Sequence, residues 1–168
     1  GCGIPVAKHG NKAVSSKSGA ADVLSALGIK LDCDMALVER ALAEANIAFL
    51  MAPRHHAAMR HVAPVRAALG VRTIFNLLGP LSNPALVKRI MVGVFDQSYC
   101  APFAHVLARL GTSHAWVVHG ADGLDEVSTT GKTHVAALVD GKVSEFTISP
   151  EDIGLPTARL DQLRGGDG

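Results

Sequence analysis

The fold is decided by the stretch Ile4-Pro5-Val6-Ala7-Lys8-His9-Gly10-Asn11-Lys12-Ala13-Val14-Ser15-Ser16-Lys17-Ser18-Gly19. A short apolar run leads into a loop rich in lysine, serine and glycine, and helical sequence follows from Ala20. Lysine supplies positive charge, hydroxyls and backbone N–H groups donate hydrogen bonds, and glycine lets the backbone approach a ligand. The stretch therefore favours a phosphate-binding loop between a strand and a helix. The alternative is an ordinary strand-to-helix connection, because serine and lysine are common in loops.

The composition restricts the class of protein. The sequence has 168 residues, of which 48% are hydrophobic, which suits one domain with a sizeable core. Only 4% are aromatic, and the wealth of small aliphatic residues favours helices on a parallel sheet over a β-sandwich. A net charge of +1 is too balanced for nucleic-acid binding by bulk charge. No apolar run approaches the roughly 18 residues of a membrane span, so no membrane partner is expected.

The pattern of apolar residues, caps and turns predicts a chain in which strands alternate with helices. Three cysteines, odd in number and far apart, indicate reduced thiols and a cytoplasmic protein. The expected strands are 4–7, 47–51, 89–95, 114–119, 134–139 and 143–148, and the expected helices are 20–27, 35–45, a segment from about 55 that Pro64 bends or restarts, 73–78 and 101–110.

This alternation predicts an α/β fold with a largely parallel sheet flanked by helices. Asp140-Gly141 between the last two strands is a strong signal for a type I′ β-hairpin at the C-terminal end. Asp34 is expected to cap the helix 35–45.

Unusual polar residues follow three of the expected strands. Lys8-His9-Gly10-Asn11 follows the first, His55-His56 the second, and Asp125-Glu126 the strand that ends at His119. Open α/β sheets bind ligands at the carboxyl ends of their parallel strands. We therefore expect the three loops to meet at one edge of one sheet.

The acidic pair Asp125-Glu126 suits a magnesium ion. Mg²⁺ takes one or two carboxylates together with phosphate oxygens and water, so a phosphate-binding loop nearby would complete its coordination. The alternative is a solvated acidic turn. Asp122 is close in sequence, but Asp122-Gly123 first indicates turn chemistry.

The histidine pair offers ligand donors but no zinc site, because no cysteine or glutamate stands at ligand spacing nearby. Either His55 or His56 can face a ligand while the other is structural. Arg66 follows His55 by 11 positions, about 16 Å on an unbroken helix, unless Pro64 turns the chain. Arg66 is then either a fork for a carboxylate or a surface arginine.

These motifs resemble anthranilate phosphoribosyltransferase. The resemblance rests on Lys8-His9-Gly10-Asn11, on Ser15-Ser16-Lys17-Ser18-Gly19, on His55-His56 and on Gly123-Leu124-Asp125-Glu126. It also rests on Arg72-Thr73-Ile74-Phe75-Asn76-Leu77-Leu78-Gly79-Pro80-Leu81-Ser82-Asn83-Pro84. The resemblance implies transfer of a phosphoribosyl group from phosphoribosyl pyrophosphate to anthranilate, with Mg²⁺ as cofactor, in tryptophan biosynthesis.

The resemblance also implies roles for individual residues. Anthranilate would contact Asn11, His55 or His56, and Arg66, and Mg²⁺ would bind Asp125 and Glu126. Ala20 stands where the family commonly has serine, so a phosphate-binding hydroxyl is missing there. Phosphoribosyl pyrophosphate would be lined by Lys8, His9, Gly10, Asn11, Lys12, Ala13, Val14, Ser15, Ser16 and Ala20.

The family also has an N-terminal helical domain, a glycine-rich pyrophosphate loop and further C-terminal helices, none of which this sequence contains. We therefore expect residues 1–168 to be an incomplete α/β phosphoribosyltransferase domain, a fragment of a two-domain protein that is inactive by itself. The full-length protein is expected to be a homodimer. Alternative readings are a pyrimidine nucleoside phosphorylase relative and a non-catalytic homologue that binds nucleic acid.

Overall fold

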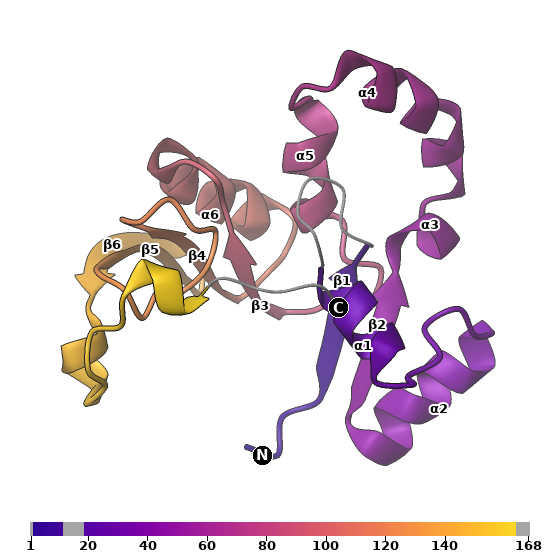
Figure 1. The fold of residues 1–168 in the computed structure, drawn as a ribbon, viewed down its shortest axis with the longest axis horizontal. Helices are drawn as coiled ribbons and strands as arrows, with labels where there is room; N and C mark the ends of the chain where they lie inside the picture. Colours follow the sequence, from indigo (N-terminus) through magenta and orange to yellow (C-terminus); the bar gives the residue numbers. More distant parts are fainter. Residues whose placement is uncertain (1, 12–18, 164–168) are drawn as a thin grey trace. The chain divides into compact units, whose positions relative to one another are not determined.

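The structure, a computed structural model, describes residues 2–11 and 19–163. It forms two compact units, one within residues 1–86 and one within residues 87–164, which are described separately below (Figure 1). None of the described helices is both long and apolar enough to cross a membrane.

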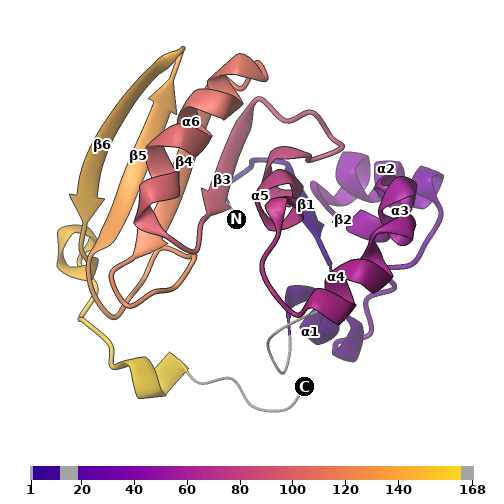
Figure 2. The same ribbon diagram turned by 90° about the horizontal axis from the view of Figure 1, so that it is seen from above.

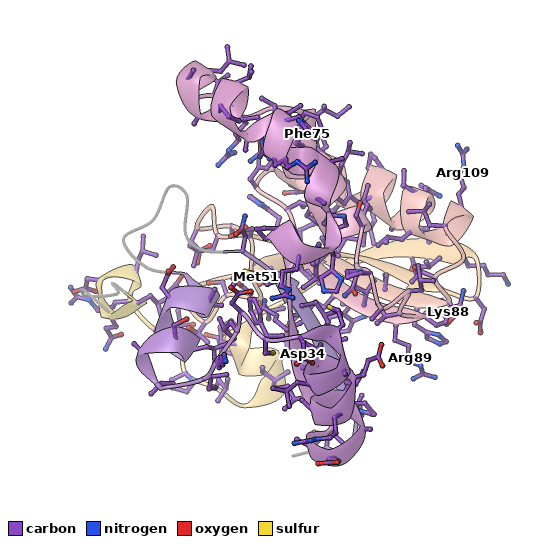
Figure 3. The ribbon with its side chains drawn as sticks, turned by 90° about the vertical axis from the view of Figure 1, so that its right-hand side faces the viewer. Asp34, Met51, Phe75, Lys88, Arg89 and Arg109 are labelled. Carbon is purple, nitrogen blue, oxygen red and sulfur yellow. The ribbon has the colours of Figure 1, made fainter. Side chains whose placement is uncertain are left out.

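The first unit is built on two parallel strands, β1 (Val6–Gly10) and β2 (Ile47–Met51). Helices α1 (Ala20–Ala26) and α2 (Met35–Ala45) lie between them in sequence. Asp34 caps α2 by accepting a hydrogen bond of 2.8 Å from the Leu37 N–H, as predicted, and Figure 3 shows it at the start of that helix. Val38 of α2 packs on the strand pair, because it faces Ala48 and Leu50.

A run of short helices follows β2. Pro64 is in the first turn of α4, so it starts a new helix rather than bending an old one. At the end of the run, the Asn83 side-chain amide donates to the Ala7 carbonyl at 3.2 Å, which ties the chain back to β1. The run consists of α3 (Ala52–His55), η1 (Ala57–His61), α4 (Ala63–Leu69), α5 (Ile74–Leu78) and η2 (Gly79–Leu81).

The second unit is a four-stranded sheet in the order β3-β4-β5-β6 with helix α6 on one face (Figure 2). The strands β3 and β4 are parallel, whereas β4, β5 and β6 are antiparallel. Its elements are β3 (Arg89–Gly93), η3 (Gln97–Tyr99), α6 (Cys100–Arg109), β4 (His114–Gly120), β5 (Thr133–Val139), β6 (Lys142–Ile148), η4 (Pro150–Ile153) and η5 (Leu160–Leu163).

Both faces of this sheet carry buried apolar side chains. Phe103 and Leu107 of α6 are buried, and alternation along β4 and β5 turns Val117 and Leu138 to the same face. A cluster of Val118, Val135 and Ala137, with Val127 and Ile148 against it, lies on the opposite face. Partial desolvation raises the pKa of the buried Cys100 thiol to about 11, so this cysteine is an unreactive core residue.

The α/β class is confirmed, but the expectation of one largely parallel sheet is wrong. The described strands form two sheets, and the larger one is mixed. The parallel pairs are those whose connection contains a helix, because a parallel crossover needs a long connection. Residues 121–132 between β4 and β5 form no helix, so β5 returns antiparallel.

The predicted hairpin is confirmed. Asp140 and Gly141 both have positive φ, 46° and 83°, as a type I′ turn requires, and they join β5 to β6. The first strand begins and ends later than expected, since β1 covers Val6–Gly10 rather than residues 4–7. Lys8, His9 and Gly10 therefore belong to a paired strand and not to a loop.

Candidate functional site

The carboxyl ends of β1 and β2 bring together two histidines from distant parts of the sequence. His9 pairs in register with Leu50 near the end of β2, and His56 follows α3 directly after that strand. Their Nε2 atoms are 3.2 Å apart, and the two rings meet edge to face. A hydrogen bond between them requires one ring to donate and the other to accept, so the tautomers of the two rings depend on each other. The predicted meeting of these two segments is confirmed.

Strand alternation separates Lys8 from His9. Successive residues of a strand point to opposite faces, so Lys8 lies on the same side as its cross-strand neighbour Phe49, whereas His9 lies on the side of Ala7. A Cβ atom on Gly10 would lie 2.9 Å from the Phe49 ring. Glycine at this position therefore makes room for Phe49 at the end of β1.

The remaining predicted residues near β1 have varied positions. Asn11 and Ala20 are exposed, and Ala20 is the first residue of α1. The Gly19 N–H before that helix is bound by the Asp22 carboxylate at 3.0 Å. The residues Lys12, Ala13, Val14, Ser15 and Ser16 lie outside the part of the chain that the structure describes.

His55, the neighbour of His56 in the sequence, has a different setting. His55 ends α3 instead of opening a helix as expected, and His56 is the residue that faces His9. Arg54 beside them forms an ion pair with Asp32 at 2.5 Å, which links α3 to the segment before α2.

Arg66 lies in α4 with its guanidinium 5.4 Å from the centre of the Phe75 ring. Figure 3 labels Phe75 on α5. This cation–π contact orients the guanidinium of Arg66, a group that can bind a carboxylate through two of its N–H donors. The chain from His55 to Arg66 passes through η1 and a new helix, so the separation expected for an unbroken helix does not apply.

The cluster of His9, His55 and His56 makes the stability of the first unit sensitive to acid. Partial burial lowers the pKa of His9 below its ordinary value, and His56 and His55 lower it further. Burial, His56 and Arg54 likewise lower the pKa of His55. The native state then binds fewer protons than the unfolded chain just below about pH 6.5, so native stability is present above that pH and falls as acid is added.

We therefore expect the thermal unfolding temperature of the chain to decrease from about pH 7.5 to about pH 5.5. A His9→Asn variant should show a shallower decrease, because one of the titrating groups is gone. The matched control is His105→Asn, which removes an exposed histidine from α6. Equal slopes for the two variants would contradict the assignment.

The acidic pair lies in the second unit, in the connection after β4. The side chains of Asp125 and Glu126 are both exposed. A Cβ atom on Gly93, at the end of β3, would lie 2.5 Å from the Asp125 carbonyl carbon and nearer still to its oxygen. The acidic loop therefore rests its backbone directly on β3. Because β4 belongs to the second sheet, the expectation that all three loops share one sheet edge is wrong for this loop.

Asp122 does not lie free beside that pair. Its carboxylate accepts hydrogen bonds from the hydroxyls of Ser128 and Thr130 and, at 3.0 Å, from the Leu124 N–H. Burial acts to raise the pKa of Asp122, but these hydrogen bonds outweigh it and lower the pKa below its ordinary value. The predicted turn role of Asp122-Gly123 is confirmed.

The exposed carboxylates fit a magnesium ion by their chemistry. Within the described residues, no group of three or more His, Cys, Asp or Glu side chains could hold a metal ion. Two adjacent carboxylates leave coordination positions for phosphate oxygens and water, which is the arrangement that Mg²⁺ favours with phosphate substrates.

Two features were missed from the sequence. The contact between His9 and His56 has a signal in the period-two alternation of a strand. If the first strand extends to Gly10, His9 lies on the opposite face from Lys8, near the end of the strand that precedes His56. The Asp122 network has a weaker signal, the run of three hydroxyl residues Ser128-Thr129-Thr130, and the sequence does not say which carboxylate they meet.

Comparison with known proteins supports the resemblance drawn from the motifs. The chain is 61% identical over 166 residues to the anthranilate phosphoribosyltransferase of Rhodospirillum rubrum, which covers 99% of this chain and 48% of the relative. It is 63% identical over 166 residues to the enzyme of the same name from Azospirillum brasilense, covering 99% of this chain and 46% of the relative. The chain thus spans about half the length of the curated relatives it matches.

Solved structures show the same likeness. The crystal structure of anthranilate phosphoribosyltransferase from Thermus thermophilus matches with a TM-score of 0.89 and 49% identity, covering 98% of this chain and 48% of that one. The enzyme from Saccharomyces cerevisiae in complex with PRPP and Mg matches with a TM-score of 0.85 and 33% identity, covering 98% and 45%. The family described as "Glycosyl transferase family, a/b domain" matches residues 1–168. Since this match extends over the whole chain, the chain belongs to the glycosyl transferase family, as its a/b domain.

Proposed function

We propose that the chain forms the α/β part of an anthranilate phosphoribosyltransferase of tryptophan biosynthesis. The reaction transfers the phosphoribosyl group from phosphoribosyl pyrophosphate to anthranilate and yields N-(5-phosphoribosyl)anthranilate and pyrophosphate. The observation that carries the proposal is the His9–His56 contact at 3.2 Å, which joins two of the motifs that resemble this enzyme at the carboxyl ends of β1 and β2. Identities of 61% and 63% to enzymes of that name support it.

The residues divide between the two substrates. Lys8, on the face of β1 that carries Phe49, supplies positive charge to phosphoribosyl pyrophosphate, together with residues 9–16 and the helix start at Ala20. We assign the binding of anthranilate, the aromatic acceptor, to Asn11, to His55 or His56, and to Arg66. His56 rather than His55 is the better candidate of the two adjacent histidines, because His9 orients its ring. Arg66, held over Phe75, is assigned to the anthranilate carboxylate.

Asp125 and Glu126 would hold the magnesium ion. When bound, Mg²⁺ neutralises charge on the pyrophosphate group and makes it a better leaving group. The Saccharomyces cerevisiae enzyme was solved in complex with PRPP and Mg, which supports a role for magnesium.

The protein groups act by binding and orientation. A bond forms between the anthranilate nitrogen and the anomeric carbon of the ribose, while the bond from that carbon to the pyrophosphate oxygen breaks and pyrophosphate keeps the electron pair. The nitrogen then releases one of its two protons to water. The aryl amine is already neutral at neutral pH, so no general base is needed before attack. This chain contributes to catalysis in two ways. Its anthranilate-binding residues position the amine, and Lys8 stabilises the negative charge that develops on the leaving pyrophosphate.

The proposal is tested by calorimetric titration of phosphoribosyl pyrophosphate in the presence and absence of Mg²⁺. Because the relatives are about twice as long, the titration uses a full-length protein that carries these 168 residues. We expect Mg²⁺-dependent binding that Lys8→Ala weakens by about 10- to 100-fold, since a hydrogen bond to a charged group contributes about 1.5–3 kcal/mol.

The matched control is Lys30→Ala, which removes the same charge from an exposed position of the first unit. If both variants bind as the parent protein does, the site assignment is wrong. Absence of any transfer to anthranilate, with turnover of a nucleoside and phosphate instead, would favour the nucleoside phosphorylase alternative.

For the full-length protein we also propose a homodimer in the cytoplasm. The three free cysteines support a reducing compartment. Sedimentation of the full-length protein tests the oligomeric state.

A further inference from the structure

We propose that Asp122 is a positioning residue for the acidic pair Asp125-Glu126, and that it acts by tying together the two limbs of the loop that carries them. This inference rests on the proposed function, since it concerns how the carboxylates of that site are held. The loop follows β4 and returns to β5, and the acidic pair lies between its two limbs.

The hydrogen bonds of Asp122 reach both limbs. Its Oδ1 accepts from the Leu124 N–H at 3.0 Å on the limb that leaves β4. Its Oδ2 accepts from the hydroxyls of Ser128 and Thr130 on the limb that approaches β5. Ser128 is itself buried and fixed, because its N–H donates to the Thr133 hydroxyl at 2.9 Å at the start of β5. Asp122 thus connects the ends of two strands through a single carboxylate.

The backbone of the loop is built around this carboxylate. Gly120, the last residue of β4, packs so closely on Asp122 that a Cβ atom there would collide with Oδ1 and would lie 3.2 Å from the Ser128 Cβ. The Gly120 N–H donates to the Leu124 carbonyl at 2.8 Å, and Gly123 turns the chain with a φ of 89°. A side chain at position 120 would therefore have to displace the Asp122 carboxylate.

The acidic pair is held on both sides as a result. Leu124 precedes the pair and is fixed by Asp122 and Gly120, and Val127 follows it and packs against the cluster of Val118, Val135 and Ala137. The two carboxylates between them remain exposed. A fixed backbone with exposed carboxylates is the arrangement that preorganises metal ligands, because the protein does not have to order the loop when the ion binds.

Asp122 differs from a third metal ligand in the use of its oxygens. Both oxygens accept hydrogen bonds from protein donors, whereas Asp125 and Glu126 present theirs to solvent. The three carboxylates therefore have two roles: Asp122 holds the loop, and Asp125 and Glu126 are available to bind the ion.

The test compares Asp122→Asn with Asp140→Asn in a full-length protein that carries this chain. Asparagine keeps the size of the side chain but cannot accept at both ends. We expect the Mg²⁺ concentration for half-maximal transfer to rise by about 10- to 100-fold, as for other residues that orient metal ligands, with kcat at saturating Mg²⁺ retained. Asp140→Asn removes the same charge from the exposed β5–β6 turn, where asparagine tolerates the positive φ, and should leave the Mg²⁺ dependence unchanged.

A double-mutant cycle with Ser128→Ala identifies the route. If Asp122 acts through the Ser128 hydroxyl, the double variant should require little more Mg²⁺ than Asp122→Asn alone. Additive increases in the required Mg²⁺ would overturn the proposed route.

Hydrogen exchange of the Leu124 amide separates this inference from the proposed function. Asp122→Asn should speed that exchange relative to Asp140→Asn, with or without Mg²⁺. Unchanged exchange, or an unchanged Mg²⁺ dependence, would overturn the positioning role. If the parent protein shows no Mg²⁺-dependent transfer but Asp122→Asn still speeds exchange, the proposed function fails while the hold of Asp122 on the loop is upheld.

Discussion

Replacing Gly93 by alanine is expected to destabilise the second unit by about 3 kcal/mol, the upper part of the usual cost of overpacking a tight site. The new Cβ atom would lie 2.5 Å from the Asp125 carbonyl carbon, in the backbone of the acidic loop. A rotation of a side chain cannot relieve this collision, so either β3 or the loop has to move. Urea unfolding followed by the fluorescence of Trp116, the single tryptophan, reports on this unit because Trp116 lies in β4.

The matched control for this substitution is Gly131→Ala. Gly131 is in the same connection between β4 and β5, and a Cβ atom there would meet open space. Its substitution should leave the unfolding midpoint nearly unchanged. Equal effects of the two substitutions would show that the acidic loop does not rest on β3 as described.

The double substitution Asp125→Asn/Glu126→Gln is expected to reduce transfer to anthranilate about a thousandfold in a full-length protein that carries this chain. Metal stabilisation of a leaving group contributes several kcal/mol, and each ~1.4 kcal/mol corresponds to a factor of ten in rate. Amides keep the size of the side chains but lose the charge that attracts Mg²⁺. The residual activity should also lose its dependence on Mg²⁺, which steady-state rates at graded Mg²⁺ concentrations measure.

The second unit offers a matched control for the loss of two charges. Glu151 and Asp152 are another adjacent acidic pair, exposed in η4. Their amide variants, Glu151→Gln/Asp152→Asn, should retain both the rate and its Mg²⁺ dependence. If the two double variants lose activity equally, the effect is one of net charge, and the metal assignment is wrong.

Much of the secondary structure could be predicted because its signals are local. Asp34 caps α2 through a neighbour three residues away, and Asp140-Gly141 turns the chain within two residues. The apolar run 47–51 became β2 with the predicted bounds. The motif residues were also identified from local sequence: Lys8 and His9 lie in β1, the His55-His56 pair follows β2, and the acidic pair lies in the connection after β4.

Strand pairing was less predictable, because it depends on residues far apart in the chain. The sequence alone predicted one largely parallel sheet. Because residues 121–132 form no helix, β5 returns antiparallel to β4, and β1 and β2 form a separate sheet. The extent of β1 changed for the same reason: pairing with β2 continues to Gly10 opposite Met51, so Lys8 and His9 became strand residues.

By itself, the sequence determined the α/β class, the position of most helices and strands, the family resemblance and the set of candidate residues, because each of these depends on short-range patterns and on residue identity. Only the tertiary structure decided how those residues are used. It placed His9 against His56 across 47 positions of sequence. It also paired the Asp122 carboxylate with hydroxyls of its own loop and left Asp125 and Glu126 exposed. The physical reason is that a hydrogen-bond partner is chosen by proximity and burial in the folded chain, which residue types do not reveal.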